Sequence, residues 1–169
     1  MDETADAIFD REAPIRTGPN TVSPDWIDYN GHMNVAYYTM AFDKALDEVY
    51  DMIGIGPRLA REAQMGPMAL QTMIHYLGEL VEGEAYVCDV TLLDADAKRA
   101  HVFVEMRKAA EESLAATYES LTMNVDLGKR RSAPFPEAAQ ARLSRLKAAH
   151  AGLPRAPQIG APLGIRRKG

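Results

Sequence analysis

The chain has 169 residues, of which 47% are apolar and 25% charged, and its formal net charge at pH 7 is −5. These values are typical of one soluble globular domain with short extensions, and no apolar run reaches the roughly 18 residues that a membrane-spanning helix needs. The single cysteine, Cys88, excludes an internal disulfide framework, and the N-terminus lacks the basic and apolar parts of a signal peptide, so we expect a cytoplasmic protein.

Charge is distributed unevenly along the chain. Residues 129–169 contain ten Lys or Arg and one acid, whereas residues 1–128 contain nine Lys or Arg and 23 acids. The acidic body argues against nucleic acid as a partner. The basic C-terminal part either contacts phosphates or forms a solvated helix face and tail.

The first third of the chain predicts a strand followed by one long helix. Residues 1–13 are expected to be a flexible leader, and residues 14–24, which Gly and Pro interrupt, an edge strand. From residue 35 to residue 53, apolar side chains recur at helical spacing. Asn34 is the expected N-cap of this helix and Gly54 its terminating residue.

Four segments of strand character follow in close succession: 67–80, 84–95, 99–109 and 113–126. The breaks between them are short enough for hairpins, so neighbouring strands should run antiparallel. The order of one strand, one long helix and four strands predicts an α+β domain over 14–133, with the helix on one face of a five-stranded antiparallel sheet.

The C-terminal part is expected to contain one more helix. Residues 134–151 have the pattern of a basic amphipathic helix that begins near Pro136. Seven of the 18 residues from 152 to 169 are Gly or Pro. This composition predicts an irregular or disordered tail.

The stretch DYNGHMN, residues 28–34, places several polar side chains immediately before the long helix. The free N–H groups and the dipole of a helix N-terminus favour a negative charge, so Asp28 should stay ionised and could act as nucleophile or general base. The same N–H groups could hold a developing oxyanion, and Gly31 would let the backbone approach closely. Alternatively, Asp28, Asn30 and Asn34 are only turn and capping residues.

The neighbours of Asp28 leave further alternatives open. His32 either orients a substrate carbonyl, the Asp28 carboxylate or a water, or is a loop histidine bonded to the backbone. Four aromatic residues near the loop either belong to the core or an interface, or wall an acyl pocket and bind a cationic group: Trp26, Tyr29, Tyr37 and Tyr38. Cys88 has no base beside it and is interpreted as a core residue. No closely spaced ligand set is present, so we expect no metal site.

The segment WIDYNGHMNVAYYTMAFDKA, residues 26–45, resembles the motif of the hotdog-fold acyl-CoA thioesterases, in the 4-hydroxybenzoyl-CoA thioesterase-like branch. The resemblance extends over about residues 14–136. More narrowly, PDWIDYNGHMN and RRSAPFPE are similar to the betainyl-CoA thioesterases of carnitine degradation, which also occur fused to carnitine dehydrogenase. The resemblance implies a long helix wrapped by a five-stranded sheet, and a homodimer or tetramer with active sites at the dimer interface.

The same resemblance implies roles for individual residues. Asp28 matches the catalytic acid, Gly31 the glycine that follows it, and His32 a helper of variable role. Backbone N–H groups from Asn34 to Tyr37, and so including Val35, match the oxyanion donors. The implied activity is hydrolysis of an acyl-CoA thioester without a further cofactor, and betainyl-CoA is the narrower expectation.

Two other functions remain open at this point. A hotdog dehydratase would act on hydroxyacyl thioesters, but it usually pairs a histidine with a carboxylate of the partner subunit. A non-catalytic acyl-CoA-binding protein would not need the placed carboxylate. Five basic residues are either partners for the CoA phosphates or ordinary surface charges: Arg58, Arg61, Lys129, Arg130 and Arg131.

Overall fold

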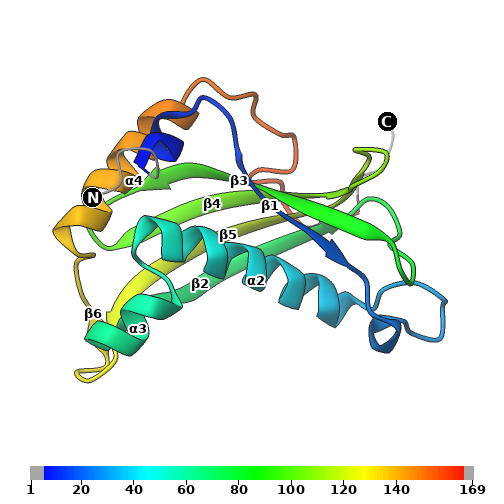
Figure 1. The fold of residues 1–169 in the computed structure, drawn as a ribbon, viewed down its shortest axis with the longest axis horizontal. Coiled ribbons are helices and arrows are strands. Elements are labelled where there is room, and N and C mark those ends of the chain that lie inside the picture. The colour runs from blue at the N-terminus through cyan, green and yellow to red at the C-terminus, as the bar shows by residue number, and fades with distance from the viewer. Residues whose placement is uncertain (1–5, 166–169) are drawn as a thin grey trace.

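The computed structural model describes residues 6–165 and has a curved antiparallel sheet wrapped around one long helix, α2 (Figure 1). The strand order is β1-β3-β4-β5-β2, and β6 pairs with β5. The strands are β1 (Ile15–Thr21), β2 (Met65–Tyr76), β3 (Ala85–Ala95), β4 (Arg99–Lys108), β5 (Leu114–Asp126) and the two-residue β6 (Arg131–Ser132). The helices are η1 (Ala7–Asp10), η2 (Pro24–Trp26), α2 (Val35–Ile53), α3 (Pro57–Ala63) and α4 (Glu137–His150).

Helix α2 begins and ends where the sequence predicts. The side chain of Asn34 caps it by accepting a hydrogen bond from the backbone N–H of Ala36 at 3.0 Å. Gly54 ends it with a φ of 91°, a left-handed conformation that suits glycine. One face of α2 packs on the sheet through buried side chains that include Phe42, Leu46 and Val49. The prediction of an α+β domain with the helix on one face of the sheet is confirmed.

The connection between β2 and β3, residues 77–84, differs from the prediction. A hairpin was expected there, but β2 pairs with β5 and lies at the opposite edge of the sheet from β1. The connection instead passes the N-terminal end of α2, where Leu80 is fully buried and its carbonyl accepts a hydrogen bond from Met33 N at 2.7 Å. Burial of Leu80 and this bond favour the crossing over a local hairpin, and they bring Tyr76 and its successors to the start of α2.

The expectation of a flexible leader over residues 1–13 is wrong for residues 6–13; residues 1–5 lie outside the described part. Phe9, in η1, is only 2% exposed and belongs to the hydrophobic core. Asp10 forms an ion pair with Arg145 of α4 at 2.6 Å, and Asp6 forms one with Arg142 at 3.4 Å. The basic face of α4 is therefore partly neutralised by acids of the leader, and is not simply solvated.

The segment after α4 has no helix or strand up to residue 165, as the prediction of an irregular tail requires, and residues 166–169 lie outside the described part. It nevertheless packs on the sheet face opposite α2. The N–H of Gly160 donates to a carboxylate oxygen of Glu119 at 2.7 Å, and the other oxygen of Glu119 lies 2.8 Å from Nε2 of His101.

Within residues 6–165, no helix is both long enough and apolar enough to cross a membrane.

Candidate active site

The loop before α2 is a short closed turn. Ile27 and Met33 form an antiparallel bridge, the N–H of Asp28 donates to the carbonyl of His32 at 3.1 Å, and Gly31 N donates to the carbonyl of Asp28 at 2.9 Å. Gly31 has a φ of 83°, and a Cβ added there would meet no atom within 4 Å. The glycine is therefore required by the backbone conformation of the turn and not by close packing.

The Asp28 carboxylate is held by neutral donors. One oxygen accepts from the backbone N–H of Asn30 at 2.8 Å, and the other accepts from the side-chain amide of Asn34 at 3.2 Å. Within residues 6–165, Asp28 forms no ion pair. Asn34 thus caps α2 with its amide oxygen and contacts Asp28 with its amide nitrogen. Its capping role is confirmed, and a functional role for Asp28 and Asn34 stays a prediction.

The backbone N–H groups at the start of α2 are mostly occupied. Asn34 N donates to the carbonyl of Trp26 at 2.9 Å, Ala36 N to the side chain of Asn34, and Tyr37 N to the carbonyl of Asn34 at 3.0 Å. The N–H of Val35 has no acceptor among the described residues, and Val35 is 57% exposed. The set of four N–H groups predicted as oxyanion donors therefore narrows to Val35.

A hollow of about 410 Å³ opens beside Val35. We call it the α2 hollow. Its lining residues come from two segments far apart in the sequence: His32, Met33, Val35 and Tyr38 from the loop and helix, and Tyr76, Leu77, Gly78 and Glu79 from the end of β2 and the connection to β3. The second group was missed by the sequence analysis, because the assumed hairpin would have kept these residues beside β3. No local pattern in residues 76–79 distinguishes them from an ordinary strand end.

His32 lines the α2 hollow, but its ring is engaged with the backbone. Its Nδ1 lies 3.3 Å from the carbonyl oxygen of Met33, an acceptor, so Nδ1 carries the hydrogen in this contact. In the neutral ring Nε2 is then the acceptor nitrogen. The side chains of His32 and Asp28 share no hydrogen bond among the described residues. A helping role for His32 toward the substrate stays a prediction.

The four aromatic residues near the loop are placed differently from one another. Trp26 stacks on Tyr37 with ring centroids 5.4 Å apart, and Lys44 Nζ lies 5.7 Å from the Trp26 ring centre. Tyr29 is 95% exposed at the turn. Tyr38 is buried and is the one of the four that lines the α2 hollow.

The fold, the placed carboxylate and the hollow can be compared with known proteins. Residues 22–143 match the thioesterase-like superfamily. The chain belongs to this superfamily. Among solved structures, this thioesterase-like chain is similar to a hypothetical protein of Staphylococcus aureus in complex with CoA, with a TM-score of 0.83 and 25% identity, over 91% of this chain and 98% of that one.

Curated relatives carry more specific names. The chain is 30% identical to the betainyl-CoA thioesterase of Pseudomonas aeruginosa, over 89% of this chain and 95% of the relative. It is 32% identical to the L-carnitine dehydrogenase/betainyl-CoA thioesterase of Rhizobium meliloti, over 94% of this chain. The chain spans only 32% of the length of that second relative.

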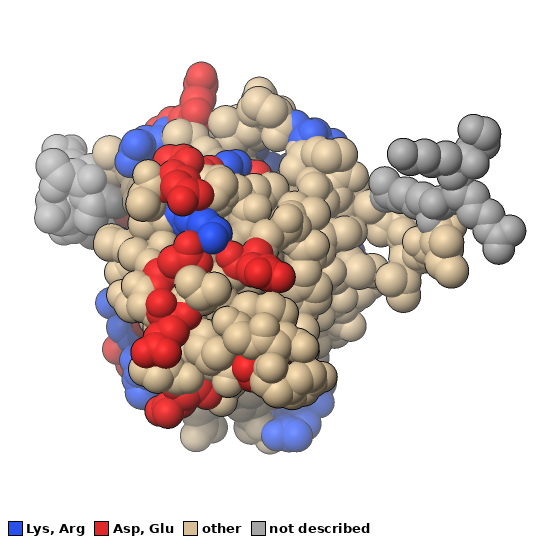
Figure 2. Space-filling model, turned by 90° about the vertical axis from the view of Figure 1, so that its right-hand side faces the viewer, with Lys and Arg blue, Asp and Glu red and all other residues tan. Residues whose placement is uncertain are grey.

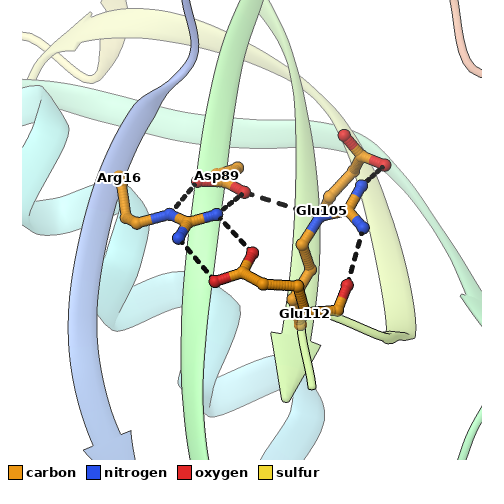
Figure 3. Close-up of polar contacts among 5 residues, drawn as sticks. Arg16, Asp89, Glu105 and Glu112 are labelled. Atoms are coloured by element: carbon orange, nitrogen blue, oxygen red, sulfur yellow. Dashed lines mark hydrogen bonds and ion pairs between the residues drawn. The ribbon is translucent and has the colours of Figure 1, made fainter. Parts of the chain in front are cut away.

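A second acidic cluster of this thioesterase-like chain lies on the sheet face opposite α2, and its carboxylates are paired with arginine (Figure 3). Arg16 of β1 donates to both oxygens of Asp89, at 2.7 and 2.8 Å, and to both oxygens of Glu112, each at 2.8 Å. Arg107 of β4 donates to Glu105 at 2.8 Å and lies 3.5 Å from Asp89. This cluster ties β1, β3 and β4 together, and each of its three carboxylates is paired with one of its two arginines, which offset most of the negative charge.

The basic residues proposed for CoA phosphates lie far from Asp28 in one chain. Arg58 and Arg61 belong to α3, Lys129 and Arg130 to the turn before β6, and Arg131 is the first residue of β6. Both groups lie beyond the C-terminal end of α2, whose 19 residues span about 28 Å. Hollows of about 420 and 500 Å³ between β2 and the C-terminal segment contain no residue of the Asp28 loop. Within residues 6–165, no three His, Cys, Asp or Glu side chains are placed to hold a metal ion.

Proposed function

We propose that this protein hydrolyses an acyl-CoA thioester to a free carboxylate and CoA, without a cofactor besides the substrate and in the cytoplasm. The observation that carries the proposal is the Asp28 carboxylate, which two neutral donors hold in the loop that leads directly into Val35, whose N–H has no acceptor among the described residues. Membership of the thioesterase-like superfamily supports the same reaction.

The reaction requires one carboxylate, which acts as base or nucleophile, and one hydrogen-bond donor to the oxyanion. The thioester carbonyl oxygen accepts a hydrogen bond from Val35 N–H, which stabilises the negative charge that develops on it. Asp28 then takes a proton from water while the water oxygen attacks the carbonyl carbon. The C–S bond breaks, and the leaving thiolate of CoA gains a proton. In the alternative route the Asp28 carboxylate attacks the carbonyl carbon itself, and water hydrolyses the resulting anhydride.

The acyl group that we propose is betainyl, a short acyl group that carries a quaternary ammonium ion. The names of the relatives from Pseudomonas aeruginosa and Rhizobium meliloti support this choice. The loops at the active-site end, residues 22–34, 77–84 and 109–113, contain seven acids and no Lys or Arg. Figure 2 shows Asp and Glu side chains gathered on this end, a charge that favours a cationic acyl group.

The acting unit that we propose is a homodimer formed through β2. This strand is a sheet edge and carries exposed apolar side chains that a second copy would cover, among them Met68 and Leu70. Antiparallel pairing of two β2 strands places α3 of one copy near the active-site end of the other. The basic residues of α3 and of the β6 turn then become partners for the CoA phosphates across the interface.

The proposal is tested by measuring free thiol and free carboxylate from a panel of betainyl-, aromatic and medium-chain acyl-CoA. Equal amounts of both products are expected, and a hydroxyacyl substrate should not be dehydrated. Cys88 does not disturb the thiol measurement, because burial raises the pKa of its thiol to about 12.

Asp28→Asn is expected to lower thiol release by orders of magnitude, because it keeps the turn but removes the charge. Asp25→Asn is the matched control, since Asp25 is an exposed acid of the same loop. Binding of acyl-CoA without thiol release by the wild type would refute the proposal, and equal turnover of Asp28→Asn and Asp25→Asn would refute the assignment of Asp28.

A further inference from the structure

The α2 hollow has an aromatic corner. The rings of Tyr38 and Tyr76 lie 5.3 Å apart between centroids and at 81° to each other, and both residues line the hollow. In such an edge-to-face pair the edge of one ring meets the face of the other, and both residues border the hollow. A quaternary ammonium ion in the hollow would therefore meet aromatic surface, and aromatic rings attract it because their faces are electron-rich.

The backbone that carries a carboxylate, that of Glu79, is held beside this corner. The hydroxyl of Tyr38 donates to the carbonyl of Gly78 at 3.4 Å and accepts from the N–H of Leu80 at 3.2 Å. These two bonds hold the backbone on both sides of Glu79, which also lines the hollow. Burial raises the pKa of Tyr38, and the negative charges of Glu79 and Glu84 raise it further.

The two carboxylates differ in whether they are already neutralised. Glu84 pairs with Lys108 at 2.7 Å, whereas Glu79 forms no ion pair among residues 6–165. A carboxylate that forms no ion pair, in a hollow lined by two aromatic rings, attracts a positive ligand and repels a negative one. Val35, whose N–H is free, lines the same hollow, so an acyl group in the hollow can present its carbonyl to that N–H.

We propose that the α2 hollow binds the quaternary ammonium end of the acyl group and that Tyr38, Tyr76 and Glu79 determine specificity for it. This inference rests on the proposed thioesterase function and names the part of the site that selects the substrate. The ammonium ion lies against the rings of Tyr38 and Tyr76 and near the carboxylate of Glu79. The carbonyl then points toward Val35 N–H and Asp28.

The test compares two substrates that differ only in charge. Betainyl-CoA and tert-butylacetyl-CoA have the same shape, because a carbon atom replaces the nitrogen of the trimethylammonium group. For the wild type, kcat/KM is expected to be at least about tenfold higher for betainyl-CoA, since cation–π and Coulomb attraction act on that substrate alone.

Three variants locate the source of this preference. Glu79→Gln and Tyr76→Leu are each expected to reduce the preference about tenfold, whereas Tyr76→Phe, which keeps the ring, should retain most of it. Glu82→Gln is the matched control, because Glu82 lies in the same connection and is exposed but does not line the hollow. It should leave the preference unchanged.

The outcomes separate this inference from the proposed function. If the wild type releases thiol from both substrates at similar kcat/KM, the thioesterase stands and the specificity site is wrong. If Glu79→Gln and Glu82→Gln reduce the preference equally, the acidic surface as a whole selects the substrate and Glu79 has no special role. If the wild type releases thiol from neither substrate nor from any other acyl-CoA, the proposed function itself fails.

Discussion

Asp28 and Asp89 are both partly or fully buried carboxylates that accept at least two hydrogen bonds, but their partners differ in charge. Asp89 accepts from the guanidinium of Arg16 and lies near that of Arg107. Asp28 accepts from an amide side chain and a backbone N–H. A guanidinium neutralises a carboxylate, whereas a neutral donor orients it and leaves its charge available. The kind of partner, and not the number of bonds, therefore distinguishes an acid that can react from one that stabilises the fold.

The largest expected contrast between the two acids is in turnover. Asp28→Asn should lower kcat about a thousandfold, because the group that activates water or attacks the thioester loses its charge. Asp89→Asn should change kcat less than about twofold. Steady-state thiol release by the two purified variants measures the difference, and a comparable loss in both would show that Asp28 acts through the fold alone.

The next contrast concerns the orientation of Asp28 by Asn34. Asn34→Ala removes both the helix cap and the amide donor, so it should lower the free energy of unfolding by about 1 kcal/mol and kcat about tenfold. Asn34→Ser can still cap α2 but has a side chain too short to reach the carboxylate in the same way. In Asn34→Ser the free energy of unfolding, measured with urea, should therefore return close to the wild-type value, whereas kcat should stay reduced as in Asn34→Ala. Full recovery of both would leave Asn34 with a capping role only.

For stability we expect the opposite result to that for turnover, with a larger effect of Asp89→Asn than of Asp28→Asn. Asp89→Asn should lower the free energy of unfolding by about 1 to 2 kcal/mol, a range reduced because Arg16 is partly exposed to solvent. Asp28→Asn should change it by less than about 0.5 kcal/mol, since an amide can accept the same hydrogen bond from Asn30 N. Equilibrium urea unfolding at neutral pH measures the free energy of unfolding of both variants. A larger decrease for Asp28→Asn than for Asp89→Asn would contradict the comparison.

The smallest expected effect is the pH dependence of the arginine-paired cluster. Hydrogen bonds from Arg16 lower the pKa of Glu112 below its ordinary value of 4.5. A carboxyl with a lowered folded-state pKa contributes stability that is fully present above the unfolded value and is lost as pH falls through the folded value. Glu112→Gln should make the decline in stability below about pH 4.5 slightly shallower, and high salt should shrink the difference because Glu112 is exposed. Unfolding curves of wild type and variant across this pH range, at two salt concentrations, measure it.

Much of the fold could be predicted because its signals are local. The helical spacing from Val35 to Ile53, the cap at Asn34 and the glycine at position 54 lie within one segment, and the structure follows them. The strand predicted over residues 99–109 is likewise a signal within one segment, and the structure has β4 there, with Val102, Val104 and Met106 in the core. The burial of Phe9 could not be foreseen, because it depends on contact with α4, more than a hundred residues away.

The candidate site was predictable only in part, for the same physical reason. The motif around Asp28 lies on one continuous segment, so its carboxylate, turn and cap could be recognised together. Tyr76 and Glu79 approach that segment only because the connection from β2 passes the start of α2 and buries Leu80. A pairing between β2 and β5 is a long-range choice, which spacing in the sequence does not encode.

Because residues 77–84 pass the start of α2, the residues proposed for the reaction and those proposed to select the acyl group come from two separate segments of the chain. In the proposed reaction the groups that break the bond belong to the loop and first turn around Asp28 and Val35, whereas the residues proposed to select the acyl group, Tyr76 and Glu79, lie at the end of β2 and in the connection to β3. Substitutions in that connection can therefore alter which acyl group is accepted while the reacting groups stay in place. A lineage of such proteins could acquire new substrates by changing a few residues after β2, with the chemistry inherited intact.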